Sequence, residues 1–514
     1  MMKTRDLPSQ QVCAAWSNRI LILSLLGIAY LTLFPFEFHF DGNPAYRVSP
    51  FFLGMNEKPV RYLDFFLNVL LFIPFGFGLS TQLRKRGRSL RLSFLLALAF
   101  GAFTSYTVEF LQLFIPQRDS GWEDVFSNTM GSVTGFFLFA LYGGAILVTL
   151  TKWEDSFVSW LSVRRGALLL AAYFAVWLGI SALLQNETRL SNWDAECPLL
   201  VGNDASGQNP WTGKIFLLQI WNRALSGEGI RRLTGRESAE DATTGLLAAY
   251  DFRSSQPLKD QRDFLPPLEW FPERPQPPNS GPIEFDGRAW LETKSPVENL
   301  TREIKRTSHF TIRIVCAPAA VDGGSGRILS LSRSLDNVNF NIRQQGGDFV
   351  FYFLNPLSAK RSNLVWFTPS VFEAGKVRDI VAVYDGSDAY LYLDGNRMPN
   401  IYRLGPGASL IHTFSFIQTG DLDGYIIFYE VIVFMPAGIL IGLAAAKWFK
   451  QKTPDWWLLV IGWALPALLL EFFLAWDSGR RIWVWNIVLA LAFGLAGFLL
   501  INSDWNFKNS REGS

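Results

Sequence analysis

The chain has 514 residues, a formal net charge of +2 and an aromatic content of 15%. This length exceeds what one ordinary hydrophobic core accommodates, so we expect two or more domains. The charge is close to neutral and no run of Lys and Arg is interleaved with aromatic residues, which excludes a typical nucleic-acid-binding protein.

Eight windows of the sequence are apolar enough, over enough residues, to cross a bilayer. The first window is followed by no small-residue cleavage site, so we interpret it as a retained span and not as a signal peptide. In chain order the windows are Ile20–Phe36, Leu63–Ser80, Leu92–Pro116, Val125–Leu150, Gly166–Leu184, Tyr425–Ala446, Trp456–Trp476 and Ile482–Ile501.

Lys and Arg residues flank the windows at alternate links. By the positive-inside rule, these links and both termini are cytoplasmic, the protein is a multi-pass protein of the cytoplasmic (inner) membrane, and residues 186–424 are extracytoplasmic. Arg480 and Arg481 are exceptions, because they fall on the outer side. The flanking residues are Lys3, Arg5, Arg19, Arg84, Lys85, Arg86, Arg88, Arg91, Lys152, Arg164, Arg165, Lys447, Lys450, Lys452, Lys508 and Arg511.

The three cysteines are too few for a disulfide scaffold. For Cys197 and Cys316 we expect two buried thiols, because cysteine is among the residues most often buried. A disulfide between them is the alternative if the middle region is extracytoplasmic.

Short motifs recur in the two apolar halves and predict an internal repeat. Each unit would contain four spans, so the two units insert in the same orientation as parallel repeats, with span five corresponding to span one. The alignment places a four-residue deletion after the second pair of motifs. The matched pairs are Phe72–Gly76 with Phe434–Gly438, Glu109-Phe110 with Glu471-Phe472, Asp119–Gly121 with Asp477–Gly479, and Asn128 with Asn486.

Polar residues cluster at the predicted outer ends of spans two, three and four. Charged groups in spans are costly and are therefore candidates for function. Here they predict a ligand-binding site, with Arg118 as a counter-ion; the alternative is that the groups only join helices to one another. The cluster comprises Asp64, Asn68, Glu109, Gln112, Arg118, Asp119, Asp124 and Asn128.

The second unit retains only part of this cluster, so we interpret it as degenerate. Its counterparts are Glu430, Glu471 and Asn486, while Ile426, Leu474 and Ile482 replace Asp64, Gln112 and Asp124. Small residues spaced as Gly131-x3-Gly135 predict close packing of span four on a neighbouring helix, and Pro74 and Gly76 lie in the repeated motif of span two.

Together, the motifs of spans one to four resemble the VanZ-like family of bacterial membrane proteins, and spans six to eight resemble it weakly. The family takes its name from a protein associated with low-level resistance to the glycopeptide teicoplanin. Many relatives look like components of cell-envelope or exopolysaccharide loci. The motifs are Tyr30–Pro35, Asp64-x3-Asn68, Phe72–Gly76, Glu109-x2-Gln112, Arg118, and Asp124-x3-Asn128-x2-Gly131-x3-Gly135.

Between Asn186 and Gly424 the pattern changes to short β-rich runs separated by Gly, Asn and Asp turns, which predicts a β-sandwich or jelly roll. Examples of these runs are Phe310–Val315, Arg327–Leu331, Phe349–Phe353, Asp379–Tyr384 and Tyr390–Leu393.

This middle region resembles a laminin-G or concanavalin-like domain. Leu246–Phe252 is similar to the opening strand of such domains, and Ile283–Gly287 and Tyr392–Gly395 are similar to their central signatures. A segment similar to the usual closing one, Ile220–Ser226, precedes the opening strand, so the domain looks circularly permuted. Terminal strands of a sandwich are often neighbours, which makes a permutation physically easy.

Laminin-G-like folds often bind carbohydrate or protein, sometimes through calcium. Asp385, Asp388 and Asp394, with Asp421 and Asp423, are candidate ligands for a hard cation. The favoured interpretation is that the Asp-Gly pairs form hairpin turns, and no other cofactor is expected.

The sequence leaves the activity open, with a binding or scaffold protein of the bacterial cell envelope favoured over an enzyme. Its ligand would be an extracytoplasmic cell-wall glycan, exopolysaccharide, lipid-linked or glycopeptide molecule, or an envelope protein. No residue is assigned to catalysis, and the three histidines lie away from the cluster in sequence. The alternatives are a membrane-embedded enzyme that uses Glu109, Asp64 or Asp124 as acid and base on a lipid-linked substrate, and a small-molecule transporter.

The expected fold is an α-helical polytopic membrane protein joined to an all-β domain. The expected boundaries are 1–165 for a VanZ-like domain of four spans, 166–185 for the fifth span, 186–424 for the β-sandwich, 425–502 for a degenerate second unit, and 503–514 for a cytoplasmic tail.

Overall fold

The computed structural model describes residues 10–34, 36, 38, 62–115, 118, 120–235, 243–275, 281–322, 324–360, 364–414, 423–448 and 456–502. The chain forms two compact units. Unit 1 contains Met1–Trp177, Ile427–Leu468 and Val484–Ser514, and unit 2 contains Leu178–Ile426 and Leu469–Trp483.

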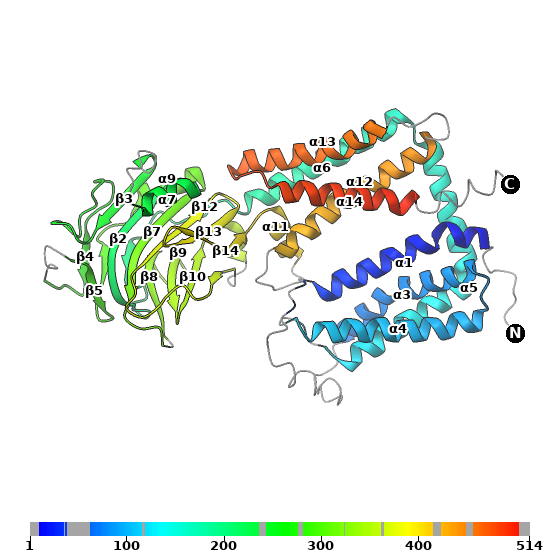
Figure 1. Cartoon of the computed structure of the whole chain (residues 1–514), viewed down its shortest axis with the longest axis horizontal. Helices are drawn as coiled ribbons and strands as arrows, with labels where there is room; N and C mark the ends of the chain where they lie inside the picture. The colour runs from blue at the N-terminus through cyan, green and yellow to red at the C-terminus, as the bar shows by residue number, and fades with distance from the viewer. Residues whose placement is uncertain are drawn as a thin grey trace. The chain divides into compact units, whose positions relative to one another are not determined.

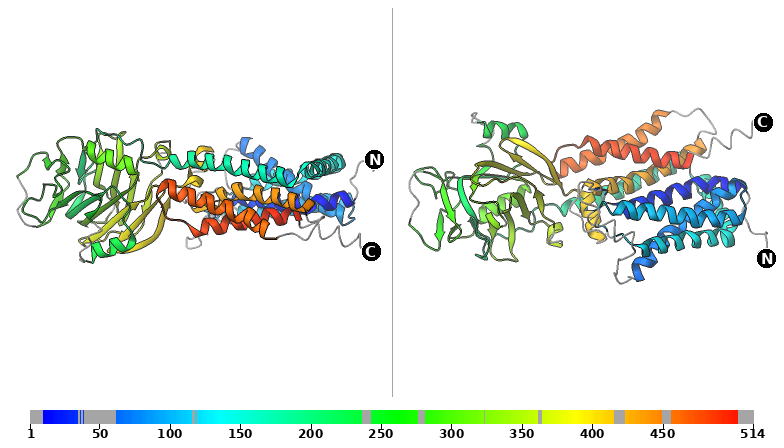
Figure 2. Two further views of the ribbon diagram at one scale, coloured as in Figure 1. Left: turned by 90° about the horizontal axis from the view of Figure 1, so that it is seen from above. Right: turned by 60° about the horizontal axis from the view of Figure 1, so that its bottom comes forward.

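Unit 1 is helical, and in its first part α1, α3, α4 and α5 lie side by side (Figures 1 and 2). Helix α3 is central, because it packs against α1, α4 and α5. The long helices are α1 (Gln10–Leu33), α3 (Tyr62–Lys85), α4 (Leu90–Gln112), α5 (Trp122–Trp160), α6 (Val163–Asn186), α12 (Asp423–Trp448), α13 (Trp456–Ser478) and α14 (Val484–Asn502); the last part of α6, the first residues of α12 and the last part of α13 belong to unit 2.

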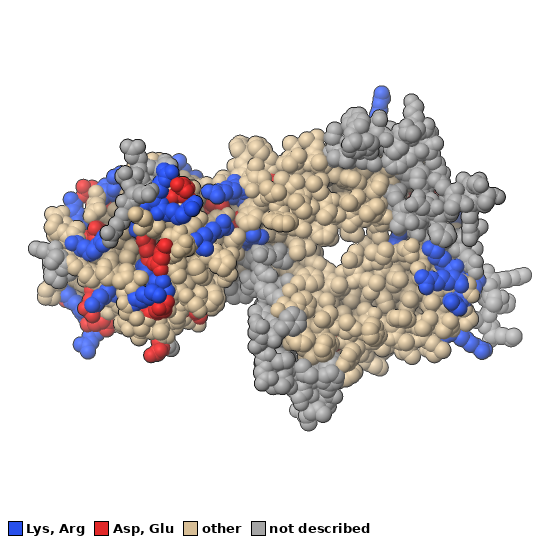
Figure 3. All heavy atoms as spheres, in the orientation of Figure 1, with Lys and Arg blue, Asp and Glu red and all other residues tan. Residues whose placement is uncertain are grey.

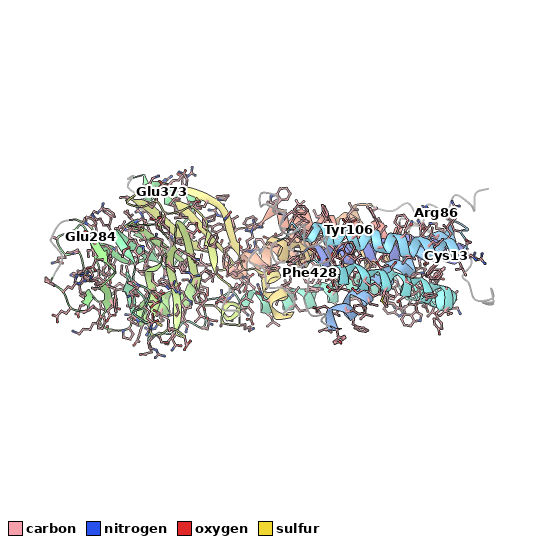
Figure 4. The ribbon with its side chains drawn as sticks, turned by 90° about the horizontal axis from the view of Figure 1, so that it is seen from below. Cys13, Arg86, Tyr106, Glu284, Glu373 and Phe428 are labelled. Atoms are coloured by element: carbon pink, nitrogen blue, oxygen red, sulfur yellow. The ribbon has the colours of Figure 1, made fainter. Side chains whose placement is uncertain are left out.

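Seven of the described helices are long and apolar enough to cross a membrane, and they confirm a helical multi-pass membrane part. Helix α13 occupies the remaining, seventh expected window, although the side chains of residues 456–461 lie outside the described set. Lys and Arg residues gather at one end of the helices of unit 1 (Figure 3). Arg86 and Cys13 lie at this end, and Tyr106 lies toward the other (Figure 4).

The helix α5 extends ten residues beyond the expected end of its span at Leu150. This extension carries Glu154, which forms an ion pair of 2.9 Å with Arg19 in the early part of α1. The apolar window marked only the part of α5 that can lie in a bilayer. A helix continues past that window as long as its backbone hydrogen bonds and its side-chain partners are satisfied.

Glycines allow the backbones of α3 and α5 to touch. A Cβ atom at Gly76 would overlap the carbonyl oxygen of Ser132, and a Cβ at Gly135 would overlap that of Ile73. Gly131 meets the carbonyl of Val69 in the same way. The Gly131-x3-Gly135 motif therefore packs α5 closely on a neighbouring helix, as its spacing predicts.

The same backbone contact recurs between α12 and α14. Here a Cβ at Gly438 would overlap the carbonyl oxygen of Gly494, and one at Gly497 would overlap that of Met435. Residue 438 stands 362 positions after residue 76, and residue 494 stands 362 positions after residue 132. The spacing is constant up to α14, so the four-residue deletion in the sequence alignment is wrong. A four-residue deletion would instead place the counterparts of Ser132 and Gly135 about one turn earlier on α14, at Ala490 and Phe493.

Unit 2 contains a β-sandwich of two antiparallel sheets (Figures 1 and 2). In the described residues, sheet A has the order β11-β10-β9-β8-β1-β6-β4, and sheet B has the order β14-β13-β12-β7-β2-β3, with β5 paired to β2. The strands are β1 (Leu199–Val201), β2 (Thr212–Trp221), β3 (Leu246–Asp251), β4 (Leu268–Phe271), β5 (Ile283–Asp286), β6 (Trp290–Thr293), β7 (Phe310–Pro318), β8 (Ser325–Ser332), β9 (Val338–Gln345), β10 (Asp348–Phe353), β11 (Trp366–Thr368), β12 (Arg378–Tyr384), β13 (Asp388–Leu393) and β14 (Asn396–Arg403).

The five β-rich runs singled out in the sequence all form strands of this sandwich. Its core is aromatic: the ring of Phe351 lies 5.6 Å from that of Phe310 and 5.9 Å from that of Trp366. Full burial of each large apolar side chain stabilises the fold by about 1.5–3 kcal/mol. Short helices complete unit 2: α7 (Gly227–Thr234), α9 (Glu298–Thr307), α10 (Pro356–Lys360) and α11 (Pro406–Phe414).

Two local features of the sandwich bear on the sequence interpretation. Strands β2 and β3 pair directly, which is the neighbourhood that a permuted chain order requires. The turn between β13 and β14 has positive φ angles at both Asp394 (51°) and Gly395 (82°), as a two-residue hairpin turn demands. Cys13, Cys197 and Cys316 are buried free thiols, so the predicted disulfide alternative is wrong.

Replacement of Gly76 by alanine should destabilise unit 1, because the new methyl group overlaps the backbone of α5. We expect a loss of about 1–3 kcal/mol and an equal loss for Gly438→Ala, measured as thermal unfolding in detergent.

Gly27→Ala provides the control, since a Cβ at this position of α1 meets no atom within 4 Å. It should be neutral or stabilise the helix by about 0.5–1 kcal/mol. Equal unfolding temperatures for Gly76→Ala and Gly27→Ala would contradict the close contact.

Candidate functional site

Glu109 of α4 lies at the start of the next helix. Its side chain is 2% exposed, and its Oε2 accepts a hydrogen bond of 3.1 Å from the backbone N–H of Gly121. Gly121 is the N-cap residue of α5 and has no side chain to cap the helix itself. A carboxylate at this place satisfies a free N–H group and interacts favourably with the helix dipole.

Arg118 and Gln112 bind the C-terminal end of helix α1. Arg118 donates to the carbonyl oxygens of Leu31 and Phe34, at 3.0 and 2.9 Å, and Gln112 donates to that of Thr32 at 2.8 Å. Burial lowers the pKa of Arg118 from its usual range, and the charge of Glu109 opposes this shift. These side chains therefore satisfy backbone groups at a helix end, where four carbonyls have no partner within the helix.

The second half repeats the contact between the glutamate and the helix start at the same spacing, whereas its arginine pairs with the glutamate and not with the end of a neighbouring helix. Glu471 accepts a 2.6 Å hydrogen bond from the N–H of Trp483, directly before α14, and forms a fully buried ion pair with Arg480. Residues 471, 480 and 483 stand 362 positions after Glu109, Arg118 and Gly121. We call this arrangement of a glutamate, an arginine and the following helix start the helix-start clamp.

The clamp explains the exception to the positive-inside pattern at Arg480. Both of its terminal nitrogens bind the carboxylate of Glu471, at 2.6 and 2.8 Å. The arginine thus carries no uncompensated charge, and its position says nothing about orientation. Because the glutamate contacts the helix start in both halves, this contact supports a structural role for Glu109.

The remaining acids of the cluster form a second, more open group. Asn68 of α3 donates a 2.6 Å hydrogen bond to Oδ1 of Asp124 at the start of α5. Both side chains are half-buried, and Asp64, one turn before Asn68 on α3, is exposed. We call Asp64, Asn68 and Asp124 the acidic group. The structure thus brings together three of the predicted site residues, while Asp119 lies outside the described residues.

The second half has not kept the acidic group. At the constant spacing, Ile426, Glu430 and Asn486 stand in the places of Asp64, Asn68 and Asp124. The predicted pairings of Asn486 with Asn128, and of Ile482 with Asp124, are therefore wrong by one helical turn, because they depended on the deletion. The first half therefore has carboxylates at two of these three positions, whereas the second half has one, at Glu430.

Asn128 lies one turn beyond Asp124 on α5 and is 1% exposed. Its Nδ2 donates to Ser105 of α4 at 2.9 Å, while its Oδ1 makes no hydrogen bond to any described residue. A buried acceptor without a partner costs free energy, which an incoming donor would recover.

The predicted calcium ligands do not converge. Asp394 binds Arg378 and the N–H of Asp379, as a turn residue does, whereas Asp385 and Asp388 share the hydroxyl group of Tyr390. The described residues contain no group of three or more His, Cys, Asp or Glu side chains that could hold a metal. Asp421 and the side chain of Asp423 lie outside the described residues.

Sequence reasoning missed the role of the C-terminal end of α13 and the residue that follows it. Within unit 2, His309 meets the carbonyl oxygen of Ser478 at 2.7 Å, and Arg189 pairs with Asp477 at 2.9 Å. Gly479 packs against the ring of His309, where its φ of 77° also favours glycine. The Asp-Ser-Gly run was visible in the sequence as a repeated motif, but only the fold shows that it binds the sandwich.

The acidic group lies in a part of the chain that matches a known protein family. Residues 21–143 match the VanZ/LLP1 family. The matched part runs from α1 into α5 and contains every predicted site residue of the first half. No curated protein and no solved structure gives a significant match to the chain. The VanZ-like segment thus supplies the family resemblance, and the β-sandwich lies outside it.

Loss of the clamp charge should cost more in the second half than in the VanZ-like segment. Glu471→Gln leaves Arg480 buried without its partner, for which we expect about 3–5 kcal/mol of lost stability. Glu109→Gln keeps an oxygen for the Gly121 N–H and should cost about 1–3 kcal/mol. Thermal unfolding of the full chain in detergent measures both.

The exposed Glu123→Gln is the control and should change stability by less than about 0.5 kcal/mol. If Glu109→Gln is as stable as Glu123→Gln, the clamp does not stabilise the VanZ-like segment.

The stability of unit 2 should depend on pH through Asp388. The pKa of Asp388 is raised from 3.8 to about 7, first by burial and then by the carboxylate of Asp385, while Arg480 and Arg403 oppose the shift. A carboxyl pKa that is higher in the folded state gives stability that is present at low pH and is lost as the pH rises through about 7. Asp388→Asn should therefore unfold at a higher temperature than the wild type at pH 8, and the difference should shrink as the pH falls toward 3.8, the pKa of an ordinary aspartate.

Asp322→Asn, on an exposed turn, serves as the control and should leave the pH profile unchanged. If Asp388→Asn and the wild type lose stability in parallel between pH 5 and pH 8, a group other than Asp388 causes the pH dependence.

Proposed function

We propose that the chain is a binding protein of the bacterial cell envelope, which holds a polar ligand at the acidic group of its VanZ-like segment. The ligand is a sugar or amino-sugar headgroup, lipid-linked or part of a glycopeptide. The observation that carries the proposal is the difference between the two halves. Both keep the clamp, whereas only the first keeps Asp64 and Asp124 next to an amide.

The chemistry of the acidic group favours donors of hydrogen bonds as ligands. The exposed carboxylate of Asp64 and the half-buried side chains of Asn68 and Asp124 offer several acceptor oxygens, and charge-assisted hydrogen bonds to the carboxylates are strong. The buried Oδ1 of Asn128 adds an acceptor that has no partner in the described part of the chain. Hydroxyl and ammonium groups of sugars are donors of this kind.

The location of the group supports a ligand outside the cell. Lys and Arg gather at the opposite end of the VanZ-like helices, around Arg86, and this end is the cytoplasmic one by the positive-inside rule (Figures 3 and 4). The acidic group and the β-sandwich are then extracytoplasmic, and the membrane is the cytoplasmic one. The sandwich in this arrangement offers a further surface to envelope glycans or proteins.

An enzyme that uses Glu109 as its acid or base is less well supported. The carboxylate of Glu109 is engaged by the N–H of Gly121, and its equivalent in the other half forms a buried ion pair. Any acid–base chemistry would fall to Asp64 and Asp124 instead, which places it in the same group and makes it subject to the same test.

The decisive experiment measures binding by the full chain in nanodiscs. The probes are a muropeptide, teicoplanin and neutral exopolysaccharide oligosaccharides, titrated by calorimetry. At least one probe should bind, and Asp124→Asn should weaken it about tenfold or more, since a hydrogen bond to a charged group contributes about 1.5–3 kcal/mol.

Asp155→Asn is the matched control, because it makes the same change at the other end of α5 and is exposed. It should leave binding unchanged. The proposal fails if no probe binds the wild type, or if Asp124→Asn and Asp155→Asn bind alike.

A further inference from the structure

Two arginines stand side by side on the outer face of sheet A. Arg327 of β8 and Arg343 of β9 are directly paired across the two strands, and Arg343 is paired in turn with Val350 of β10. Their neighbours Phe340, Ile342 and Gln344 point into the sandwich and are buried, so the arginines point outward. Both side chains are nevertheless partly covered; that of Arg327 is only 15% exposed.

The charges of this pair are not balanced by the protein. Asp204 lies 3.4 Å from Nε of Arg327, and one carboxylate thus faces two guanidinium groups. The oxygens of Asp204 are already engaged, since they accept hydrogen bonds from Ser206 and Asn209. Like charges directly opposite each other on a sheet destabilise the pairing.

The hydrogen-bonding groups of the arginines are also unsatisfied. Nη1 of Arg327 and Nε of Arg343 are buried and make no hydrogen bond to any described residue, and Nε of Arg327 has only the contact with Asp204. Burial and the charge of Arg327 together lower the pKa of Arg343 from its usual range. Buried donors without partners are rare in native proteins, and guanidinium groups are suited in shape to carboxylate, phosphate and sulfate.

The surroundings of the arginines fit a saccharide better than a free ion. The row of paired residues that contains Arg327 and Arg343 continues through Val350 to Phe367, whose side chain is 50% exposed. The adjacent row pairs the half-buried Asn341 with Tyr352. An exposed ring and an amide beside a cationic centre can stack on a sugar ring and bind its hydroxyl groups.

We propose that Arg327 and Arg343 form an anion-binding site for an acidic oligosaccharide, with the carboxylate of a uronic-acid unit between the two guanidinium groups. The site lies in unit 2 and uses none of the residues of the acidic group. It is therefore independent of the function proposed for the VanZ-like segment, and each can fail without the other.

The test is binding of hexagalacturonate to the full chain in nanodiscs, with neutral maltohexaose, inorganic phosphate and inorganic sulfate as comparison probes. Hexagalacturonate should bind, more weakly at higher salt, and maltohexaose should not. Arg343→Gln should weaken the binding about tenfold or more. Without ligand, the same variant should unfold at or above the wild-type temperature, because it removes a repulsion, so lost binding is not lost folding.

Arg397→Gln is the matched control, since Arg397 is an exposed arginine of β14 on the other sheet. It should leave binding unchanged. The proposal is overturned if hexagalacturonate binds no better than maltohexaose, if Arg343→Gln and Arg397→Gln bind alike, or if phosphate or sulfate binds and hexagalacturonate does not.

Discussion

The packing of helix on helix in this protein depends on backbone contact, which only glycine permits. At Gly76 against Ser132, and at Gly438 against Gly494, a helix lies so close to its neighbour that a single methyl group would overlap a carbonyl oxygen. Within a membrane, where the hydrophobic effect between helices is absent, such close packing is a main source of association. The contact also fixes the register of α3 on α5, and with it the height at which Asn68 meets Asp124.

Because the register of α3 on α5 is fixed, equivalent residues of the two halves can be compared. Contacts that both halves share are distinguished in this way from residues that only the first half has. The clamp of Glu109 on Gly121 recurs as Glu471 on Trp483, and a feature kept by two otherwise divergent halves answers a common structural need. Helix starts leave N–H groups without partners, and a buried carboxylate satisfies one of them in each half. What remains particular to the first half is the pair of carboxylates beside an amide, and on this difference the proposed binding site depends.

In unit 2 the charged side chains form two like-charge groups, one acidic and one basic. Near Asp388 the acids are buried and closely opposed, so they favour the protonated state and make stability depend on pH. On the outer face of sheet A the excess is of the opposite sign, at Arg327 and Arg343. A sandwich core built on aromatic contacts is stable enough to tolerate both, because its main stabilisation is independent of them.

The sequence by itself determined the class of the molecule and most of its elements. Apolar windows of sufficient length located the helices, and alternating β-rich runs located the strands, since each pattern reflects a local periodicity. Local patterns were weaker at helix ends, which is why α5 runs to Trp160 and not to Leu150. Only the tertiary structure decided the alignment of the halves, because contacts such as that of Gly497 with Met435 join distant segments. It likewise decided which polar residues are engaged and which are open, since a hydrogen-bond partner such as Gly121 for Glu109 is set by packing and has no signature in composition or spacing.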